Sequence, residues 1–297
     1  MHTPRCELSS FSFEKISKLD VNSEVFKQLS EEIVTQFRDV GFIRMIEIEN
    51  FDDQELLEQL KWFHKQSFND KMKLALNRFN NNNANKYRGY MPLVGNCAVY
   101  KEQTDYGNDS IPTSDGDPLR DFMEEKSCYP NEEHAGKIRK NYQIYTKVAD
   151  LILQLCAVGL GLPINHFQDM HSERHISTFR TLHYPPKNRE NPRTLDDQNQ
   201  IVSTPGKYLT DYSYFTINHL VLEHQDGSIL TLLCTFENYG LQVRDKQNKW
   251  SWVIPKRNTL IVNLGIIMEN ITNGELCATK HRVIDLGTFR MLFQNKE

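Results

Sequence analysis

A histidine and an aspartate two positions apart, His224 and Asp226, offer the clearest chemistry in the sequence. Side chains two apart on an extended strand point to the same face, so this imidazole and carboxylate can reach one point while Gln225 points away. A third ligand must then come from a neighbouring strand, and His281 near the C-terminus is placed to supply it. Two histidines and one carboxylate that leave adjacent positions open are the ligand set of a mononuclear non-haem Fe(II) site.

Each of these residues also has an interpretation without chemistry. His224 and Asp226 are compatible with a polar strand end, and His281 taken alone is compatible with a satisfied core histidine. Several short motifs in a fixed order favour the metal site. Upstream stands His183-Tyr184-Pro185, and downstream stand Asn263-Leu264-Gly265, Thr272-Asn273-Gly274, His281-Arg282-Val283 and Phe289-Arg290.

A second group of histidines, His166, His171 and His175, suggests a competing metal site. His171 and His175 are four apart and would share one helix face. The segment His171–His175 nevertheless lacks the glutamate placement of the HExxH helix of zinc proteases. We interpret these histidines as part of a solvated helix face. The sequence also contains no phosphate-binding glycine loop and no nucleophile elbow of a serine hydrolase.

Composition and charge indicate an ordinary globular protein. The chain has 297 residues, of which 39% are hydrophobic and 25% charged, and its formal net charge is -4. This charge gives no sign of a nucleic-acid or anionic-membrane partner, and no apolar run approaches membrane-spanning length. The first 15 residues lack the apolar core of a signal peptide. The six cysteines are scattered and form no CxxC pair, so we expect reduced thiols in a cytoplasmic protein.

Hydrophobic spacing predicts helices first and strands later. Helices are expected over Ser23–Val40, from Asp52 or Asp53 onward, and over Asn131–Val158, with a short strand over Phe42–Ile46. Loops are expected at Asn80–Asn85 and Thr104–Asp117. From Ile176 onward, short apolar runs separated by turns predict a β sandwich or barrel. These runs are Phe179–Tyr184, Phe215–Leu222, Ile229–Thr235, Leu241–Val243, Trp250–Ile254, Thr259–Asn263, Leu276–Val283 and Phe289–Phe293.

The expected organisation has two parts. Residues 1–125 form an N-terminal helical region, and residues 126–297 hold the long helix and the β core. A polar interval, Lys187–Pro205, reads as a long insertion between the first two strands of that core.

The ordered motifs resemble the isopenicillin N synthase-like family of Fe(II)/2-oxoglutarate-dependent oxygenases. The similarity extends to the N-terminal half, through Asp39–Ile43, Tyr87–Tyr90 and Lys101-Glu102. It implies an α+β, mainly β fold, in which a distorted double-stranded β-helix, or jelly roll, is flanked by N-terminal helices. It also implies an iron-dependent dioxygenase that hydroxylates or otherwise oxidises a small organic molecule.

Carried over residue by residue, the resemblance makes His224, Asp226 and His281 the iron ligands. Arg290 matches the arginine that grips the distal carboxylate of 2-oxoglutarate, for which its planar guanidinium is suited. Tyr184 matches the tyrosine that donates a hydrogen bond to the same carboxylate. The implied cofactors are Fe(II), 2-oxoglutarate as co-substrate and O2, with ascorbate as a candidate reductant. We expect a small-molecule substrate, no nucleic-acid or membrane partner, and a monomer.

Two departures from the family pattern leave alternatives open. The family usually has a serine two residues after the arginine, where this chain has Leu292, and a lost hydrogen bond to a charged group costs about 1.5–3 kcal/mol. The family's NxGD reads Asn263–Ile266 here, without the acid. A 2-oxoglutarate-independent Fe(II) oxidase of the same fold, or an inactive binding protein, are the alternatives. Arg290 is also compatible with an exposed strand residue paired with a carboxylate. Tyr184 is also compatible with a packed aromatic residue that binds no co-substrate.

Overall fold

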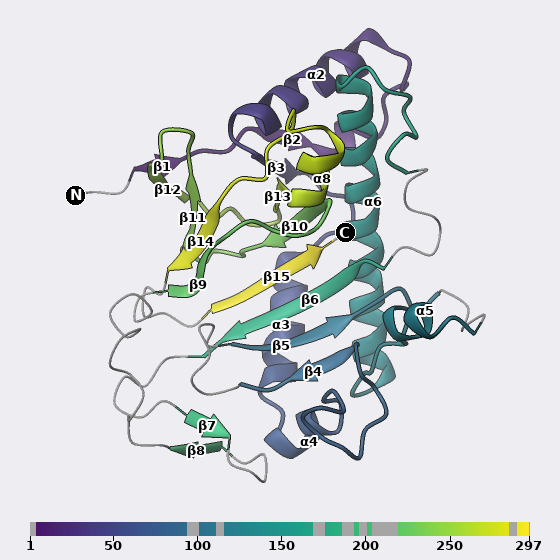
Figure 1. Cartoon of the computed structure of the whole chain (residues 1–297), viewed down its shortest axis with the longest axis vertical. Helices are drawn as coiled ribbons and strands as arrows, with labels where there is room; N and C mark the ends of the chain where they lie inside the picture. Colours follow the sequence, from purple (N-terminus) through teal and green to yellow (C-terminus); the bar gives the residue numbers. More distant parts are fainter. Residues whose placement is uncertain are drawn as a thin grey trace.

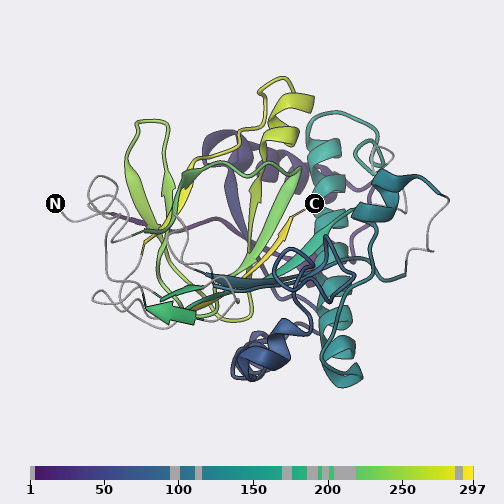
Figure 2. The same ribbon diagram turned by 60° about the horizontal axis from the view of Figure 1, so that its bottom comes forward.

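Two β-sheets face each other, and a long helix runs along the outer side of the larger one (Figures 1 and 2). The computed structural model describes residues 4–93, 101–110, 116–168, 176–185, 193–195, 201–203, 219–284 and 290–296. Its helices are α1 (Phe13–Ile16), α2 (Glu24–Asp39), α3 (Asp53–His64), α4 (Phe68–Met72), α5 (Pro118–Met123), α6 (Glu132–Gly159) and α8 (Ile266–Ile271).

The larger sheet has eight strands in the order β2-β3-β13-β10-β15-β6-β5-β4. All neighbours run antiparallel except β2 and β3, which run parallel. In chain order the strands are β2 (Ser10–Ser12), β3 (Phe42–Ile46), β4 (Gly89–Met91), β5 (Glu102–Tyr106), β6 (Thr178–Tyr184), β10 (Leu230–Cys234), β13 (Leu260–Leu264) and β15 (Arg290–Lys296).

The smaller sheet has five strands in the order β1-β12-β11-β14-β9. They are β1 (Arg5–Cys6), β12 (Trp250–Val253), β11 (Leu241–Arg244), β14 (His281–Ile284) and β9 (His219–His224). A separate ribbon joins β7 (Arg193–Leu195) to β8 (Ile201–Ser203), within the interval predicted as an insertion. Among the described residues the two sheets do not close into one hydrogen-bonded ring. The predicted α+β jelly roll with flanking helices is confirmed, in its open, two-sheet form.

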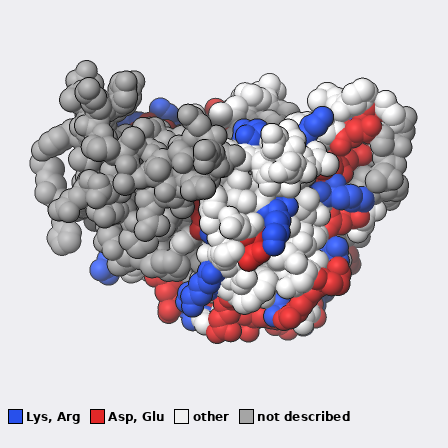
Figure 3. Space-filling view, turned by 90° about the horizontal axis from the view of Figure 1, so that it is seen from below, with Lys and Arg blue, Asp and Glu red and all other residues white. Residues whose placement is uncertain are grey.

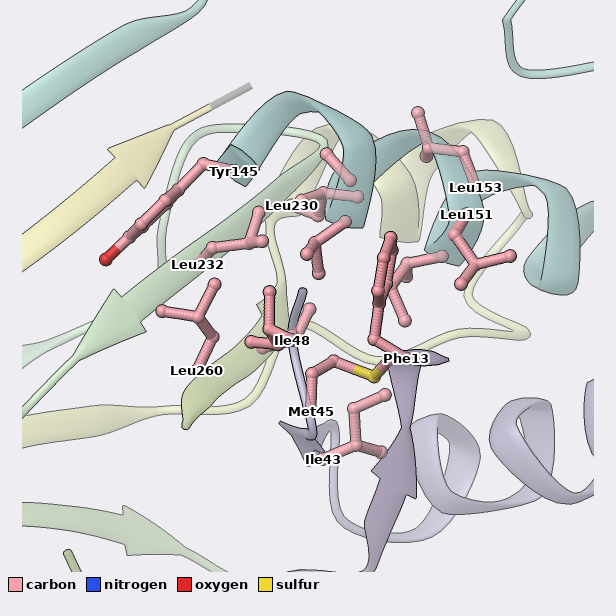
Figure 4. Packing of buried hydrophobic residues seen from close by; sticks show 14 of the residues in the cluster. Phe13, Ile43, Met45, Ile48, Tyr145, Leu151, Leu153, Leu230, Leu232 and Leu260 are labelled. Carbon is pink, nitrogen blue, oxygen red and sulfur yellow. The ribbon is translucent and has the colours of Figure 1, made fainter. Parts of the chain in front are cut away.

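The main core fills the space between the outer face of the larger sheet and helices α2 and α6 (Figure 4). Burial of each large apolar side chain there contributes roughly 1.5–3 kcal/mol. The labelled members of this core are Phe13, Ile43, Met45, Ile48, Tyr145, Leu151, Leu153, Leu230, Leu232 and Leu260.

A smaller core lies between the two sheets. Leu182 and Tyr184 of β6 pack there against Leu220 of β9 and Val283 of β14. Since side chains alternate along a strand, residues 182 and 184 of β6 face the other sheet while residue 183 faces the helices. One strand therefore serves both cores.

Capping residues fix the three long helices where the sequence predicts their starts. The side chains of Ser23, Asp52 and Asn131 each accept a hydrogen bond from a backbone N–H in the first turn of α2, α3 and α6, respectively. Gly41 follows α2 with a positive φ of 72°, and a Cβ there would lie 2.0 Å from the hydroxyl of Thr279. A glycine is therefore required for the chain to turn into β3 beside the segment that leads to β14.

Two predictions along the chain are wrong in detail. The strand predicted over Leu276–Val283 begins only at His281, because α8 and a turn with positive φ at Asn273 and Gly274 come first. Leu276 and Ala278 are buried without being in a strand, which explains the misleading apolar pattern. The loop predicted from Thr104 is in part strand, since β5 extends to Tyr106.

The N-terminal half supplies more than helices. Its strands β2, β3, β4 and β5 form both ends of the larger sheet, so that sheet draws on both sides of residue 125. The division of the chain at residue 125 stays a prediction.

Acidic and basic side chains are interleaved on the described surface seen from below (Figure 3). Exposed ion pairs among the described residues include Lys73–Asp70 at 2.7 Å and Lys140–Glu55 at 2.8 Å. Within the described residues, no helix combines the length and the apolar character needed to cross a membrane.

A buried histidine links α6 to the far end of the β5–β6 pair. His134 is 1% exposed, and its ring nitrogens contact Gln59 at 2.5 Å and the hydroxyl of Tyr106 at 3.1 Å. Burial, followed by the positive charges that His64 and Lys137 would present, lowers the pKa of His134 to about 4. The folded chain therefore holds this imidazole neutral.

We predict that the free energy of unfolding falls as the pH is lowered from about 6.5 to about 4. In that window the unfolded chain binds a proton at His134 that the folded chain does not bind, so His134 contributes up to about 1.4 kcal/mol per pH unit. Urea unfolding at several pH values in this range gives the free energy of unfolding at each pH. The slope of that free energy against pH should be smaller for His134→Asn than for the wild type. An unchanged slope would contradict the assignment.

Candidate metal centre

Strands β14 and β9 lie side by side in the smaller sheet, with β9 at its edge (Figure 1). Three candidate ligands come together where β9 ends. The antiparallel register of β9 and β14 places His281 directly opposite His224, and Asp226 follows two residues beyond the end of β9. The Nε2 atom of His224 lies 3.6 Å from Oδ1 of Asp226, and Nε2 of His281 lies 3.8 Å from Oδ2. The structure therefore unites the three residues that the sequence predicts as ligands.

Backbone carbonyls orient both imidazoles. Nδ1 of His224 lies 2.8 Å from the carbonyl oxygen of Leu222, and Nδ1 of His281 lies 3.1 Å from that of Thr279. Since a carbonyl only accepts, each Nδ1 carries the proton and each Nε2 offers a lone pair toward Asp226. The ring of Phe42 on β3 packs edge-on against His281, with centroids 5.5 Å apart, and restricts its rotation.

The carboxylate is held as firmly as the imidazoles. Asp226 is 1% exposed, and its Oδ2 accepts a hydrogen bond of 3.0 Å from the side-chain amide of Asn263 on β13. Its backbone oxygen accepts one of 2.7 Å from the N–H of Ile266 at the start of α8. The motif Asn263-Leu264-Gly265 is recognisable in the sequence, but the supporting role of Asn263 is not among the sequence-based predictions.

The spacing of the ligand atoms fits a bound ion. All three lie within 4.8 Å of one another, yet the two imidazole–carboxylate distances exceed a hydrogen bond. Neighbouring ligands of an octahedral ion at about 2.1 Å lie about 3 Å apart, so a small inward movement would close the site around the ion. The side chain of His224 is 33% exposed and that of Asp226 is fully buried, so the open side of the centre lies at His224.

A second cluster of metal-ligand residues, His64, Glu102 and His183, fits an ion less well. Here both imidazoles hydrogen-bond to Glu102, with Nδ1 to Oε1 distances of 3.0 Å for His64 and 2.6 Å for His183. The ammonium group of Lys71 lies 2.8 Å from Oε2 of the same carboxylate and already neutralises it. A buried divalent cation added here would face an unbalanced positive charge.

The two residues predicted to bind the co-substrate lie on neighbouring strands. The register of β6 and β15 places Arg290 directly opposite Tyr184. Tyr184 is 2% exposed between the sheets, and burial raises the pKa of its phenol, so its hydroxyl stays protonated and able to donate. The side chains of Arg290 and Leu292 are not among those that the structure describes, and His171, His175 and Phe215 lie outside the described residues.

Part of the C-terminal half is similar to one known sequence family. The sequence model of the 2OG-Fe(II) oxygenase superfamily matches residues 176–291. A probable iron/ascorbate oxidoreductase of Dictyostelium discoideum is 24% identical, over 93% of this chain and 78% of that protein. Isopenicillin N synthase of Streptomyces griseus is 26% identical, over 86% of this chain and 74% of that protein.

Solved structures agree on the fold. A full-length Neurospora crassa protein, in complex with alpha-KG and 5-formyluracil, superimposes with a TM-score of 0.73 at 19% identity. The match covers 97% of this chain and 83% of that one. The dioxygenase for auxin oxidation 1 of Arabidopsis thaliana, in complex with 2-oxoglutarate, gives a TM-score of 0.66 at 19% identity, over 97% of this chain and 91% of that one.

A pair of glycines beside Asp226 tests the centre without touching a ligand. A Cβ on Gly265 would lie 2.1 Å from the carbonyl oxygen of Ser228 and 2.8 Å from that of Asp226, whereas a Cβ on Gly227 meets nothing within 4 Å. We predict that Gly265→Ala weakens Fe(II) binding roughly tenfold or more, because it displaces the backbone of Asp226. Equilibrium dialysis without oxygen measures this. Gly227→Ala is the matched control, and equal affinities for the two variants would contradict the prediction.

Proposed function

We propose that the chain is an Fe(II)- and 2-oxoglutarate-dependent dioxygenase of the 2OG-Fe(II) oxygenase superfamily, in which His224, Asp226 and His281 hold the iron. The observation that carries this proposal is the convergence of two Nε2 lone pairs and one carboxylate on one point. Imidazole and carboxylate ligands on one face leave positions open for a bidentate 2-oxo acid and for O2.

The iron, when bound, supplies the activation of O2 and the oxidative decarboxylation of 2-oxoglutarate to succinate and CO2. The chain's own residues supply geometry. The carbonyls of Leu222 and Thr279 keep the histidines in the tautomer that binds a metal, and Asn263 fixes the carboxylate. The exposure of His224 leaves one side open for substrate to approach.

We propose that Tyr184 and Arg290 bind the distal carboxylate of 2-oxoglutarate. The support is their direct opposition across β6 and β15 and the protonated, buried hydroxyl of Tyr184. A guanidinium and a neutral hydroxyl donor suit a carboxylate, and a buried site strengthens both interactions.

We propose a small organic molecule as the substrate and hydroxylation as the reaction. A similar fold holds 5-formyluracil together with alpha-KG in the Neurospora crassa protein. Ascorbate as the reductant and a monomeric state stay predictions. A cytoplasmic location stays one too, with Cys6, Cys128, Cys156, Cys234 and Cys277 free thiols in the described part of the chain.

The iron centre can be tested by its complex with co-substrate. We expect the wild type, titrated without oxygen with Fe(II) and then 2-oxoglutarate, to develop the weak visible charge-transfer band of the chelate. His224→Ala should lose the band, together with succinate formation, because one of three ligands is gone. His166→Ala is the control, because this half-buried histidine lies outside the group formed by His224, Asp226 and His281. A band of full intensity in His224→Ala would refute the ligand assignment.

Leu292 allows a test of the co-substrate site. We predict that Leu292→Ser tightens 2-oxoglutarate binding roughly tenfold, because it adds a hydroxyl donor for a charged carboxylate. The same anaerobic titration gives the dissociation constant. Weaker binding in the variant would contradict the role given to position 292, whereas no binding by the wild type at any concentration would favour an oxidase that needs no 2-oxoglutarate.

A further inference from the structure

Five buried polar side chains gather on the outer face of the larger sheet, away from the metal centre. We call them the Glu102 cluster. One member lies on each of α3, α4, β4, β5 and β6. Each residue is at most 8% exposed. They are His64, Lys71, Tyr90, Glu102 and His183.

Glu102 is the hub of the cluster. Its Oε1 accepts hydrogen bonds from Nδ1 of His183 at 2.6 Å and from Nδ1 of His64 at 3.0 Å. Its Oε2 accepts one of 2.8 Å from the ammonium of Lys71 and a short one from the hydroxyl of Tyr90. Lys71 also donates to the backbone oxygen of His64 at 3.3 Å, which ties α4 to the end of α3.

Lys71 balances the charge of Glu102 without an added ion. Burial alone would raise the pKa of Glu102, but the donors His183 and His64 and the charge of Lys71 lower it, so the carboxylate stays ionised. Burial lowers the pKa of His64, so that imidazole stays neutral. One carboxylate and one ammonium therefore cancel, and the four donors occupy all the lone pairs that Glu102 offers.

The cluster is bonded to β6 through His183, one residue before the end of that strand. His183 lies opposite Glu102 in the β5–β6 register, and Tyr184, the last residue of β6, points to the other face. Across the other edge of β6, Tyr184 pairs with Arg290, the first residue of β15. Strand ends fray more readily than strand centres, so the backbone ladder alone holds this pair weakly.

We propose that the Glu102 cluster is a positioning device for the co-substrate site. It fixes the end of β6 from the helix side, so that Tyr184 and, through the ladder, Arg290 are held ready for the distal carboxylate of 2-oxoglutarate. This inference rests on the proposed function, since it assumes that Tyr184 and Arg290 bind that carboxylate. His183 is the positioning residue, because it alone among the five lies on β6.

The physical basis is the strength of hydrogen bonds to a buried charge. Such bonds are shorter and about twice as strong as neutral ones, and four of them meet on the buried carboxylate of Glu102. Removing the His183 donor would free β6 from α3, α4 and β5 at this point. A positioning partner behind a ligand typically changes affinity or activity roughly 10- to 100-fold.

The test compares two replacements of His183. His183→Leu removes the donor, and His183→Asn keeps an amide N–H near the position of Nδ1. We expect His183→Leu to raise the dissociation constant for 2-oxoglutarate roughly tenfold in the anaerobic charge-transfer titration. His183→Asn should keep most of the wild-type affinity. Fe(II) affinity should change less than about twofold in both, because the metal ligands are untouched. A purely structural role would lower stability without separating these two affinities.

Two further variants keep the proposal testable if His183→Leu does not fold. Tyr90→Phe removes one donor to Glu102 with little change in volume, and we expect it to weaken 2-oxoglutarate binding about threefold. His134→Leu is the matched control. It removes a buried histidine on the same side of the sheet, bonded to Tyr106 at the opposite end of β5. We expect it to lower stability and leave 2-oxoglutarate binding unchanged.

The contradicting outcomes are distinct. If Tyr184→Phe weakens 2-oxoglutarate binding but His183→Leu and Tyr90→Phe do not, the positioning role is wrong and the proposed function stands. If the wild type binds Fe(II) but shows no 2-oxoglutarate complex, the proposed co-substrate site fails and the inference with it. Two metal ions per chain, one of them lost in His64→Asn, would make the cluster a metal site and overturn the proposal.

Discussion

The antiparallel pairing of β9 with β14 is the constraint on which the rest of the site depends. This pairing sets His281 opposite His224, although 57 positions separate them in the sequence. Strand β9 lies at the edge of the smaller sheet, with a hydrogen-bonded neighbour on one side only. Contacts from outside this sheet therefore help to hold the paired residues in place. Phe42 of β3 packs on His281, and Asn263 of β13 bonds Asp226. Both supports come from the larger sheet, so the centre forms only where the two sheets meet.

Two buried carboxylates show how the chain separates chemistry from structure. Glu102 is neutralised within the fold by Lys71 and saturated by four donors. Asp226 receives one side-chain amide, and the two nearby imidazoles present lone pairs rather than protons to it. A buried carboxylate toward which two imidazole nitrogens are oriented is suited to a bound cation. The same residue types therefore give a closed hydrogen-bonded cluster at one place and a candidate metal centre at the other.

The three proposed ligands could be chosen from the sequence because most of their pattern is local. A spacing of two joined His224 to Asp226, although β9 ends at His224 and Asp226 lies beyond the strand, and a fixed order of motifs pointed to His281. Helix starts at Ser23, Asp52 and Asn131 were predictable because capping is local. The Glu102 cluster was not, since its hydrogen bonds join residues 38 and 81 positions apart. Such contacts depend on the strand order of the larger sheet, which spacing along the chain does not encode.

One iron bound between His224, Asp226 and His281 is the central claim. The most direct measurement is anomalous X-ray diffraction at the iron edge, from crystals of the full chain loaded with Fe(II) in the absence of oxygen. We predict one strong peak, about 2.1 Å from Nε2 of each histidine and from a carboxylate oxygen of Asp226. A peak at the Glu102 cluster in its place, or no peak between the two sheets, would contradict the claim.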